Sequence, residues 1–455
     1  MNFITKCLTQ CSDCFNYINY SNENIYQLSD YYINIRNLAQ YCLHISNKND
    51  SICYNCFLEF FHYDRFIIRH LFFYLHQQEK SYVHIREFYL FAQCIINWHE
   101  FINHTDFMLL LFHIILSKND FSRTNINFNK NIDKTSNQYF QQDDDILEKL
   151  SINSILLYEL IEDAFFFTAI QSNVQTKCTH SSQVFLERFY NYFCQLNPNH
   201  NCKTYIKLVK RVLPWGFISI HKWLKTCLLS TTKRPESILT MSKEFNSNLP
   251  FTFLWYITNW LVSNKVFLNE YDPIVTFEKV SRQELITNLY DSDRHGYSTV
   301  KLCALTYYMD GPFLIMFYCN DERIFGILLE GKLMDSAKPY GGRSSLCFQL
   351  SPQFIILERG PSMLYWNIKN RSDGPLGVRI GHNGIIRISI DLSMEHIHHP
   401  EGSSSINRVE IYKFGSYKIP IIQQQSLIHK QRNDYNVFSI DAHKLAESIG
   451  MHLFT

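Results

Sequence analysis

The spacing of apolar residues changes near Leu285, and this change constrains the fold more than any other feature of the chain. Before it, apolar residues mostly recur every three or four positions, as on one face of an α-helix. After it, short apolar runs are interrupted by glycine and proline, as strands and turns require. The pattern predicts an α+β protein with a helical N-terminal half and a β-rich C-terminal half.

The predicted strands show how the β half should pack. Several are apolar at nearly every position, which is typical of strands covered on both faces. We therefore expect a sandwich of two sheets flanked by helices. The runs are GPFLIMFY, RIFGILLE, SLCFQLSP, QFIILERGP, MLYWNI, IIRISIDL and RVEIYKFG.

The first helical region is predicted over 1–119. Within it, residues 82–116 are interpreted as two helices around a short polar turn, similar to an EF-hand pair. A calcium-binding loop needs alternating oxygen ligands, a glycine at its sixth position and a glutamate at its twelfth, and no window supplies that series. The sequence predicts a degenerate, EF-hand-like domain that binds no calcium.

A second helical region follows a polar break. Residues 120–145 are rich in asparagine and glutamine and lack periodicity, which predicts a solvated linker. Helical spacing resumes over 146–235, where Pro214 suits the first turn of a helix. The chain has 455 residues, so we expect more than one structural unit.

Charge and hydropathy exclude several classes of protein. Lysine and arginine number 43 against 42 acidic residues, which does not indicate a nucleic-acid partner. The apolar segment 107–116 is shorter than the ~20 residues of a membrane-spanning helix. The first residues lack the pattern of a secretory signal. We therefore expect a cytoplasmic protein whose 14 cysteines are reduced thiols.

A series of short motifs runs in order from ESILTMSKEFNSNLP to EIYKFG. The sharpest is LYDSDRHGYSTVKL, at 289–302, which fits the pattern LxxSxxHGxSxxxL. In this order the motifs resemble the TLDc domain family. The matching positions are Arg294, His295, Gly296, Ser298, Gly311, Pro312, Phe325, Gly326, Gly341, Phe348, Gly381 and Glu410.

The resemblance implies a TLDc β-sandwich over 236–415, with no established enzymatic activity and no cofactor. It implies binding to subunits of the vacuolar proton-pumping ATPase and peripheral association with lysosomal or endosomal membranes. It also implies roles in oxidative-stress resistance and mTOR signalling, with mTOR pathway components as further partners. The chain departs from the family pattern at 251–275, at 330–333 and in the loop HHPEGSSSINR, so it is interpreted as a divergent member.

Two other classes of function remain open. A TLDc protein that itself detoxifies peroxide needs an exposed cysteine of low pKa. Cys303, Cys319 and Cys347 lie in apolar runs, which predicts that they are buried. A purely structural scaffold would differ from an adaptor in having no element free to bind a partner.

The signature motif contains residue types that could take part in nucleophilic catalysis. Asp291, His295 and Ser298 could be imagined as parts of a nucleophile and base, but the GxSxG nucleophile elbow is missing. Serine and aspartate also favour helix N-caps, and a helix beginning near Ser298 explains the same residues. We prefer the capping interpretation and expect no catalytic residue.

Metal sites are weighed in the same way. A zinc site could be formed by Cys7, Cys11 and Cys14 together with the pair Cys53 and Cys56. The sequence distance between these two groups, however, exceeds that in a four-cysteine zinc ribbon. His396, His398 and His399 are too close in sequence to face one metal easily. The sequence predicts no metal.

The two ends of the chain carry further hypotheses. Cys7, Cys11 and Cys14 could be palmitoylated, or they could be buried or free thiols. In 416–455, a linker is followed by a predicted helix with Leu445, Ile449 and Leu453 on one face. So short a helix must dock to be ordered, either on a partner or on its own domain.

Overall fold

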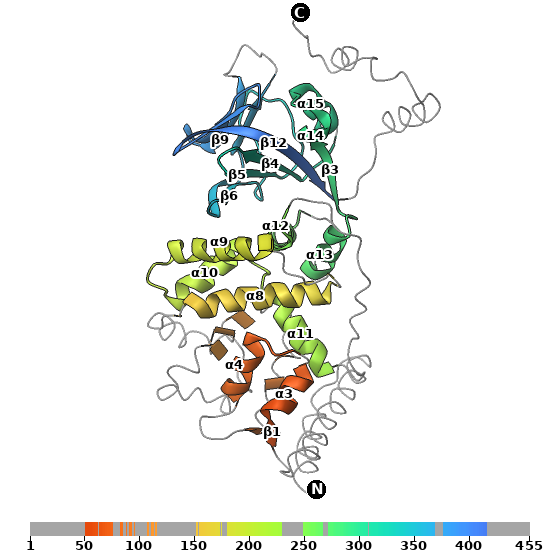
Figure 1. Cartoon of the computed structure of the whole chain (residues 1–455), viewed down its shortest axis with the longest axis vertical. Coiled ribbons are helices and arrows are strands. Elements are labelled where there is room, and N and C mark those ends of the chain that lie inside the picture. The colour runs from red at the N-terminus through yellow and green to blue at the C-terminus, as the bar shows by residue number, and fades with distance from the viewer. Residues whose placement is uncertain are drawn as a thin grey trace, which may run out of the picture. The chain divides into compact units, whose positions relative to one another are not determined.

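The computed structural model describes residues 51–75, scattered positions from 82 to 115, and most of 152–229, 249–266, 272–368 and 376–415 (Figure 1). The linker 120–145, the cysteines Cys7, Cys11 and Cys14, and the predicted helix with Leu445, Ile449 and Leu453 lie outside the described residues. The opening motif at 236–248 lies outside them as well.

The chain divides into two compact units, one within 1–134 and 220–238 and the other within 135–219 and 239–455. Among its described residues, the first unit contains a pair of short antiparallel strands with two helices between them in sequence. Their bounds are β1 Ser51–Cys53, α3 Tyr54–Phe61, α4 Phe66–Leu75 and β2 Tyr82–His84. The division between the units falls inside α11, Ile218–Leu229.

The predicted helix pair of 82–116 begins differently from the expectation. Tyr82–His84 form strand β2, which pairs antiparallel with β1. Farther along, the described positions are helical and buried, as the apolar spacing predicted. They are Phe88, Phe91, Ala92, Ile95, Phe107, Met108, Leu111, Phe112, Ile114 and Ile115. The EF-hand-like arrangement stays a prediction.

The second unit opens with helices. They are α8 Ser154–Gln171, α9 His180–Leu196, α10 Cys202–Val212, α12 Phe251–Ser263 and α13 Pro273–Ser281. Asn201 caps α10 by accepting a 3.0 Å hydrogen bond from the Thr204 amide, and Asp272 caps α13 at 2.9 Å from the Ile274 amide. The prediction that Pro214 lies in the first turn of a helix is wrong, because α10 ends at Val212 and α11 begins only at Ile218.

The β half of the second unit is one antiparallel sheet together with two short helices, which gives the α+β class predicted from the sequence. The described strands follow the order β7-β6-β5-β4-β12-β11-β10-β9-β8, and β3 also pairs with β12. The first elements are β3 Ile286–Asp291, α14 Ser292–His295, α15 Thr299–Thr306, β4 Phe313–Cys319 and β5 Ile324–Leu329. The others are β6 Leu346–Ser351, β7 Ile355–Arg359, β8 Leu364–Asn367, β9 Gly377–His382, β10 Ile385–Ile390, β11 His396–His399 and β12 Gly402–Phe414.

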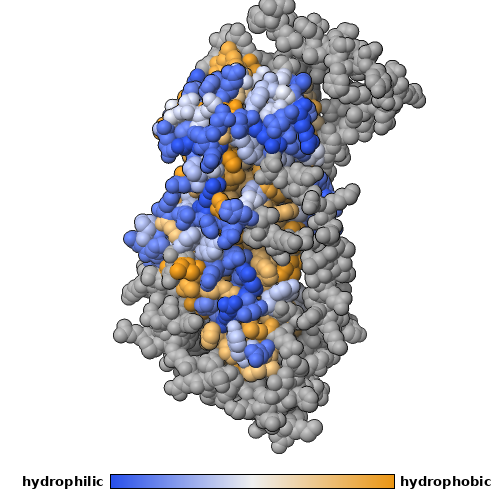
Figure 2. All heavy atoms as spheres, in the orientation of Figure 1, coloured by the Kyte–Doolittle hydropathy of each residue, from blue (hydrophilic) through white to orange (hydrophobic). Residues whose placement is uncertain are grey.

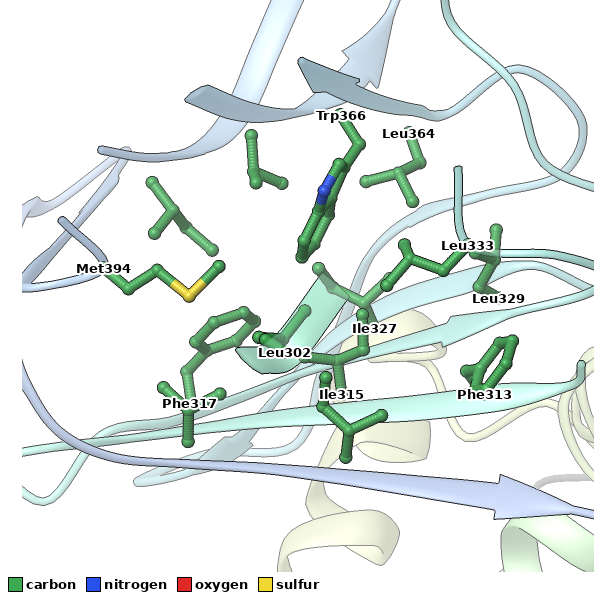
Figure 3. Close-up of a cluster of buried hydrophobic side chains, with 14 of the residues drawn as sticks. Leu302, Phe313, Ile315, Phe317, Ile327, Leu329, Leu333, Leu364, Trp366 and Met394 are labelled. Carbon is green, nitrogen blue, oxygen red and sulfur yellow. The ribbon is translucent and has the colours of Figure 1, made fainter. Parts of the chain in front are cut away.

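Strand β12 joins the two parts of this sheet (Figure 1). Its first residues pair with β11, and its later residues pair with β4 on one side and β3 on the other. Figure 3 shows Trp366, Leu364 and Met394 across the core from Phe317 and Ile315. The sheet therefore folds back over one hydrophobic core, so the expected two-sheet sandwich is built from a continuous sheet.

An aromatic cluster around Phe354 joins the helices of this unit to the sheet. Phe354 follows β6, and its ring centroid lies 5.6 Å from that of Phe185 on α9 and 5.3 Å from that of Tyr256 on α12. The Trp260 indole also donates a 2.8 Å hydrogen bond to the Ser344 carbonyl. Helices that precede the β half in sequence thus complete its packing.

Candidate functional site

The signature segment folds as a strand, one helical turn and a second helix. Strand β3 ends at Asp291, whose side chain accepts a 3.0 Å hydrogen bond from the Asp293 amide and caps α14. Ser298 accepts a 3.2 Å bond from the Lys301 amide and caps α15, as the capping interpretation expected. These local bonds fix the segment that carries Arg294, His295 and Gly296.

Tyr290 holds the turn between the two helices. Its hydroxyl donates a 2.6 Å hydrogen bond to the Gly296 carbonyl and accepts one of 3.2 Å from the Ser298 amide. Gly296 has a φ of 73°, a left-handed conformation that glycine adopts readily. His295 stacks on the Tyr290 ring, and its Nδ1 accepts a 3.0 Å bond from the Asp291 amide. The signature histidine and glycine therefore shape the turn.

Arg408 on β12 forms ion pairs with three carboxylates at this turn. Its Nη2 lies 2.9 Å from Asp291 Oδ2 and 2.6 Å from Glu410 Oε1. Its Nε lies 3.2 Å from Asp293 Oδ2, a contact that has the distance of an ion pair but not the alignment of a hydrogen bond. Arg408 can reach both buried carboxylates because Glu410 on β12 pairs with Asp291 on β3 in the register of the two strands.

Two tyrosines complete the coordination of Glu410. Tyr318 and Tyr412 donate hydrogen bonds of 2.6 and 3.0 Å to its Oε2. Burial, and then the negative charge of Glu410, raise the pKa of both hydroxyls, so both stay protonated donors at neutral pH. Burial alone would lower the pKa of Arg408, but Glu410 and Asp291 raise it. We call these six residues the Arg408 cluster: Asp291, Asp293, Tyr318, Arg408, Glu410 and Tyr412.

The Arg408 cluster has a buried floor, and two exposed residues beside it, Arg294 and Tyr297, form what we call its rim. The side chains of Glu410 and Asp291 are 1% and 4% exposed, whereas that of Arg294, 3.7 Å from Asp291, is 77% exposed. Tyr297 is 47% exposed beside them. In Figure 2 the β half, at the top of the view, presents mainly hydrophilic residues to the viewer. The rim offers an arginine and a tyrosine to solvent above buried, hydrogen-bonded carboxylates.

His295 and Ser298 each accept a hydrogen bond from a backbone amide of the signature segment. The imidazole of His295 is engaged by the Asp291 amide, and the hydroxyl of Ser298 by the Lys301 amide. Each group therefore acts on the backbone of its own turn, whereas a nucleophile and its base must engage each other.

The other signature residues lie elsewhere on the sheet. Gly326 on β5 stands opposite Phe348 on β6, and a Cβ at Gly326 would overlap the Phe348 ring. A Cβ at Gly311, which precedes Pro312, would overlap the carbonyl oxygen of Gly331. Phe325 lies on β5, Gly341 before β6 and Gly381 on β9. The close approach of the Phe348 ring accounts for Gly326, and that of the Gly331 backbone accounts for Gly311.

The histidines weighed for metal contact different polar partners. His399 Nε2 lies 3.0 Å from the Ser404 hydroxyl, and His396 Nδ1 lies 3.4 Å from Asp391. Over the described part of the chain, no three His, Cys, Asp or Glu side chains gather as metal ligands. No helix among the described elements is long and apolar enough to cross a membrane.

Sequence reasoning missed Arg408, Tyr318 and Tyr412. Arg408, Glu410 and Tyr412 alternate along RVEIYKF, and alternation places side chains on one face of a strand. That signal was present, but the partners on β3 and β4 depend on strand register, which the sequence alone does not specify.

Comparison with known families identifies the β half. Residues 268–427 match the model of the TLDc domain. The match contains the signature turn, the Arg408 cluster and every strand from β3 to β12. No curated protein matches the chain.

Proposed function

The chain carries a TLDc domain, and from this we propose that it is a non-enzymatic adaptor that binds the vacuolar proton-pumping ATPase at endolysosomal membranes. TLDc domains are generally associated with interaction with this pump and with oxidative-stress resistance. The match over 268–427 is the observation that carries the proposal. It makes subunits of the pump the first partners to test.

The finer assignment rests on the layout of the chain. Helices come first and the TLDc domain follows, a layout that resembles that of the MTOR-associated, lysosomal TLDc protein. We extend the proposal to a role in mTOR signalling, with components of that pathway as further partners. The predicted C-terminal helix would add a second contact with the pump.

The rim of the Arg408 cluster is the proposed binding surface. Arginine and tyrosine are enriched among the residues that contribute most to protein interfaces. Arg294 and Tyr297 are exposed there, on a turn whose backbone is fixed by the caps of α14 and α15. A backbone that is already ordered loses less conformational entropy when its side chains bind.

Direct peroxide detoxification by the TLDc domain is the rival enzyme hypothesis. The three cysteines of the β half, Cys303, Cys319 and Cys347, are buried, as predicted. Burial raises the pKa of Cys319 to about 12 and raises that of Cys347 as well. These thiols are therefore poor sources of the thiolate that would react with peroxide.

An affinity pull-down tests the adaptor proposal. The tagged full chain, expressed in cells with acidified endolysosomes, should enrich several subunits of the vacuolar ATPase in mass spectrometry. The same tag without the chain is the control. Recovery of no pump subunit above that control, with the chain folded and expressed, would contradict the proposal.

A further inference from the structure

The cysteine pair at the start of α3 belongs to the first unit, outside the TLDc match. Cys53 is the last residue of β1, and α3 begins at Tyr54. Cys56 lies in the first turn of the helix. The two cysteines are thus separated by one helical turn and anchored in two different elements.

The two sulfur atoms are in contact. The Cys53 thiol donates to Cys56 Sγ at 3.0 Å, and the Cys56 amide lies 3.5 Å from Cys53 Sγ. A disulfide bond is about 2.0 Å long, so the sulfurs need to approach by only about 1 Å. Rotation of the two side chains can supply that movement with the backbone in place.

The surroundings give the two thiols different access to solvent. Cys56 is 1% exposed, within the core that contains Ile52 and Phe57. Cys53 is partly exposed. The register Cys53↔Tyr82 between β1 and β2 holds its backbone. A small oxidant can therefore reach the Cys53 thiol, whereas the Cys56 thiol is shielded from solvent.

We propose that Cys53 and Cys56 form a reversible dithiol–disulfide site that is oxidised by hydroperoxides. The geometry carries this proposal: two thiols in contact, one accessible and one buried, at the junction of a paired strand and a helix. The pair resembles redox-sensing cysteines, in which an accessible thiol lies beside a resolving one.

The oxidation has two balanced steps. The Cys53 thiolate attacks one oxygen of the hydroperoxide, the O–O bond breaks, and Cys53 sulfenic acid and an alcohol or water are formed. The Cys56 thiol then attacks the Cys53 sulfur, which releases the sulfenic oxygen as water and closes the disulfide. The two thiols supply the two electrons, and an external dithiol returns them by exchange.

Alkylation and mass spectrometry test the site in the full chain. Trypsin releases both cysteines in one peptide, residues 49–65, which contains no other cysteine. After reduction, both should react with N-ethylmaleimide. After mild hydrogen peroxide they should lose this reactivity and yield a peptide lacking two hydrogens, and dithiothreitol should restore both adducts.

Variants assign the roles of the two thiols. Cys56→Ala should stop the reaction at Cys53 sulfenic acid, which dimedone traps, and Cys53→Ala should leave Cys56 unoxidised. Cys194→Ala, at a partly buried cysteine of α9, is the matched control and should leave the disulfide unchanged. Circular dichroism confirms that each variant is folded.

Two results would overturn the proposal. One is full alkylation of both cysteines in the wild-type chain after peroxide that oxidises free glutathione. The other is zinc bound in equal molar amount to the chain and lost in Cys53→Ala, because metal-bound thiolates would then explain the pair.

Discussion

The hydroxyl of Tyr318 on β4 donates a 2.6 Å hydrogen bond to Glu410 on β12, whose carboxylate is 1% exposed. Arg408 approaches the other oxygen of the same carboxylate at 2.6 Å. A buried carboxylate is costly unless it is paired and hydrogen-bonded, and both conditions are met here. The terminal motif of the β half is thereby tied to the signature turn.

Replacing Arg408 should therefore destabilise the domain strongly. Arg408→Met leaves Glu410 and Asp291 buried without their cation, and we expect a loss of about 3 kcal/mol in the free energy of unfolding, at the low end for a broken buried pair. Arg294→Met is the control. Its side chain is 77% exposed, so its loss should stay within about 0.5 kcal/mol. Equal losses of unfolding free energy for the two variants, measured by urea unfolding, would show that Arg408 does not stabilise the buried carboxylates.

Phe354 should be essential for packing of the helices against the sheet. Phe354→Ala removes ring contacts with Phe185 and Tyr256, and we expect a loss of about 3–5 kcal/mol. Phe73→Ala, at a ring that is 42% exposed, should cost far less. Urea unfolding monitored by tryptophan fluorescence compares the two variants. A Phe354→Ala loss no larger than the control's would contradict the assignment.

Gly326 should be replaceable only if Phe348 becomes smaller. Gly326→Ala places a methyl group where the Phe348 ring lies, and we expect a loss of about 1–3 kcal/mol from overpacking. Adding Phe348→Leu should recover part of that loss, because neighbouring substitutions are not additive. Strictly additive losses in a double-mutant cycle would show that the ring is not the obstacle.

His399 should make stability fall in mild acid. Burial first, and then Arg323 and His398, lower its pKa from 6.5, while Glu401 and Asp321 raise it. The folded protein therefore binds fewer protons than the unfolded chain, and stability is lost as pH falls below about 6.5 toward the folded pKa. His399→Gln should flatten this part of the profile, whereas His180→Gln, at an exposed position of α9, should not. An unchanged slope in His399→Gln would refute this role.

The sequence predicted the β half well because its signals are local. Short apolar runs separated by glycine became strands, and Ser298 capped α15 as its residue type suggested. The helix α12 was harder to predict, because eleven of its 13 residues are buried and apolar residues therefore occur on all of its faces. It was interpreted only as an extra segment in the family pattern.

The candidate site was predicted only in part. His295, Gly296 and Ser298 were found because they lie within four residues of one motif. The link from Asp291 to Arg408 spans 117 residues and depends on the register between β3 and β12. Apolar periodicity favours a register but does not say which charged side chains will meet across it.

Binding of the purified full chain to purified vacuolar ATPase, measured by biolayer interferometry, tests the adaptor proposal most directly. We expect saturable binding that Arg294→Glu with Tyr297→Ala weakens at least about tenfold, a loss typical of interface hot spots. Arg343→Glu, at an exposed arginine before β6, should bind like the wild type. Absence of saturable binding by the folded wild-type chain would contradict the proposed partner, and equal weakening by both variants would contradict the proposed surface.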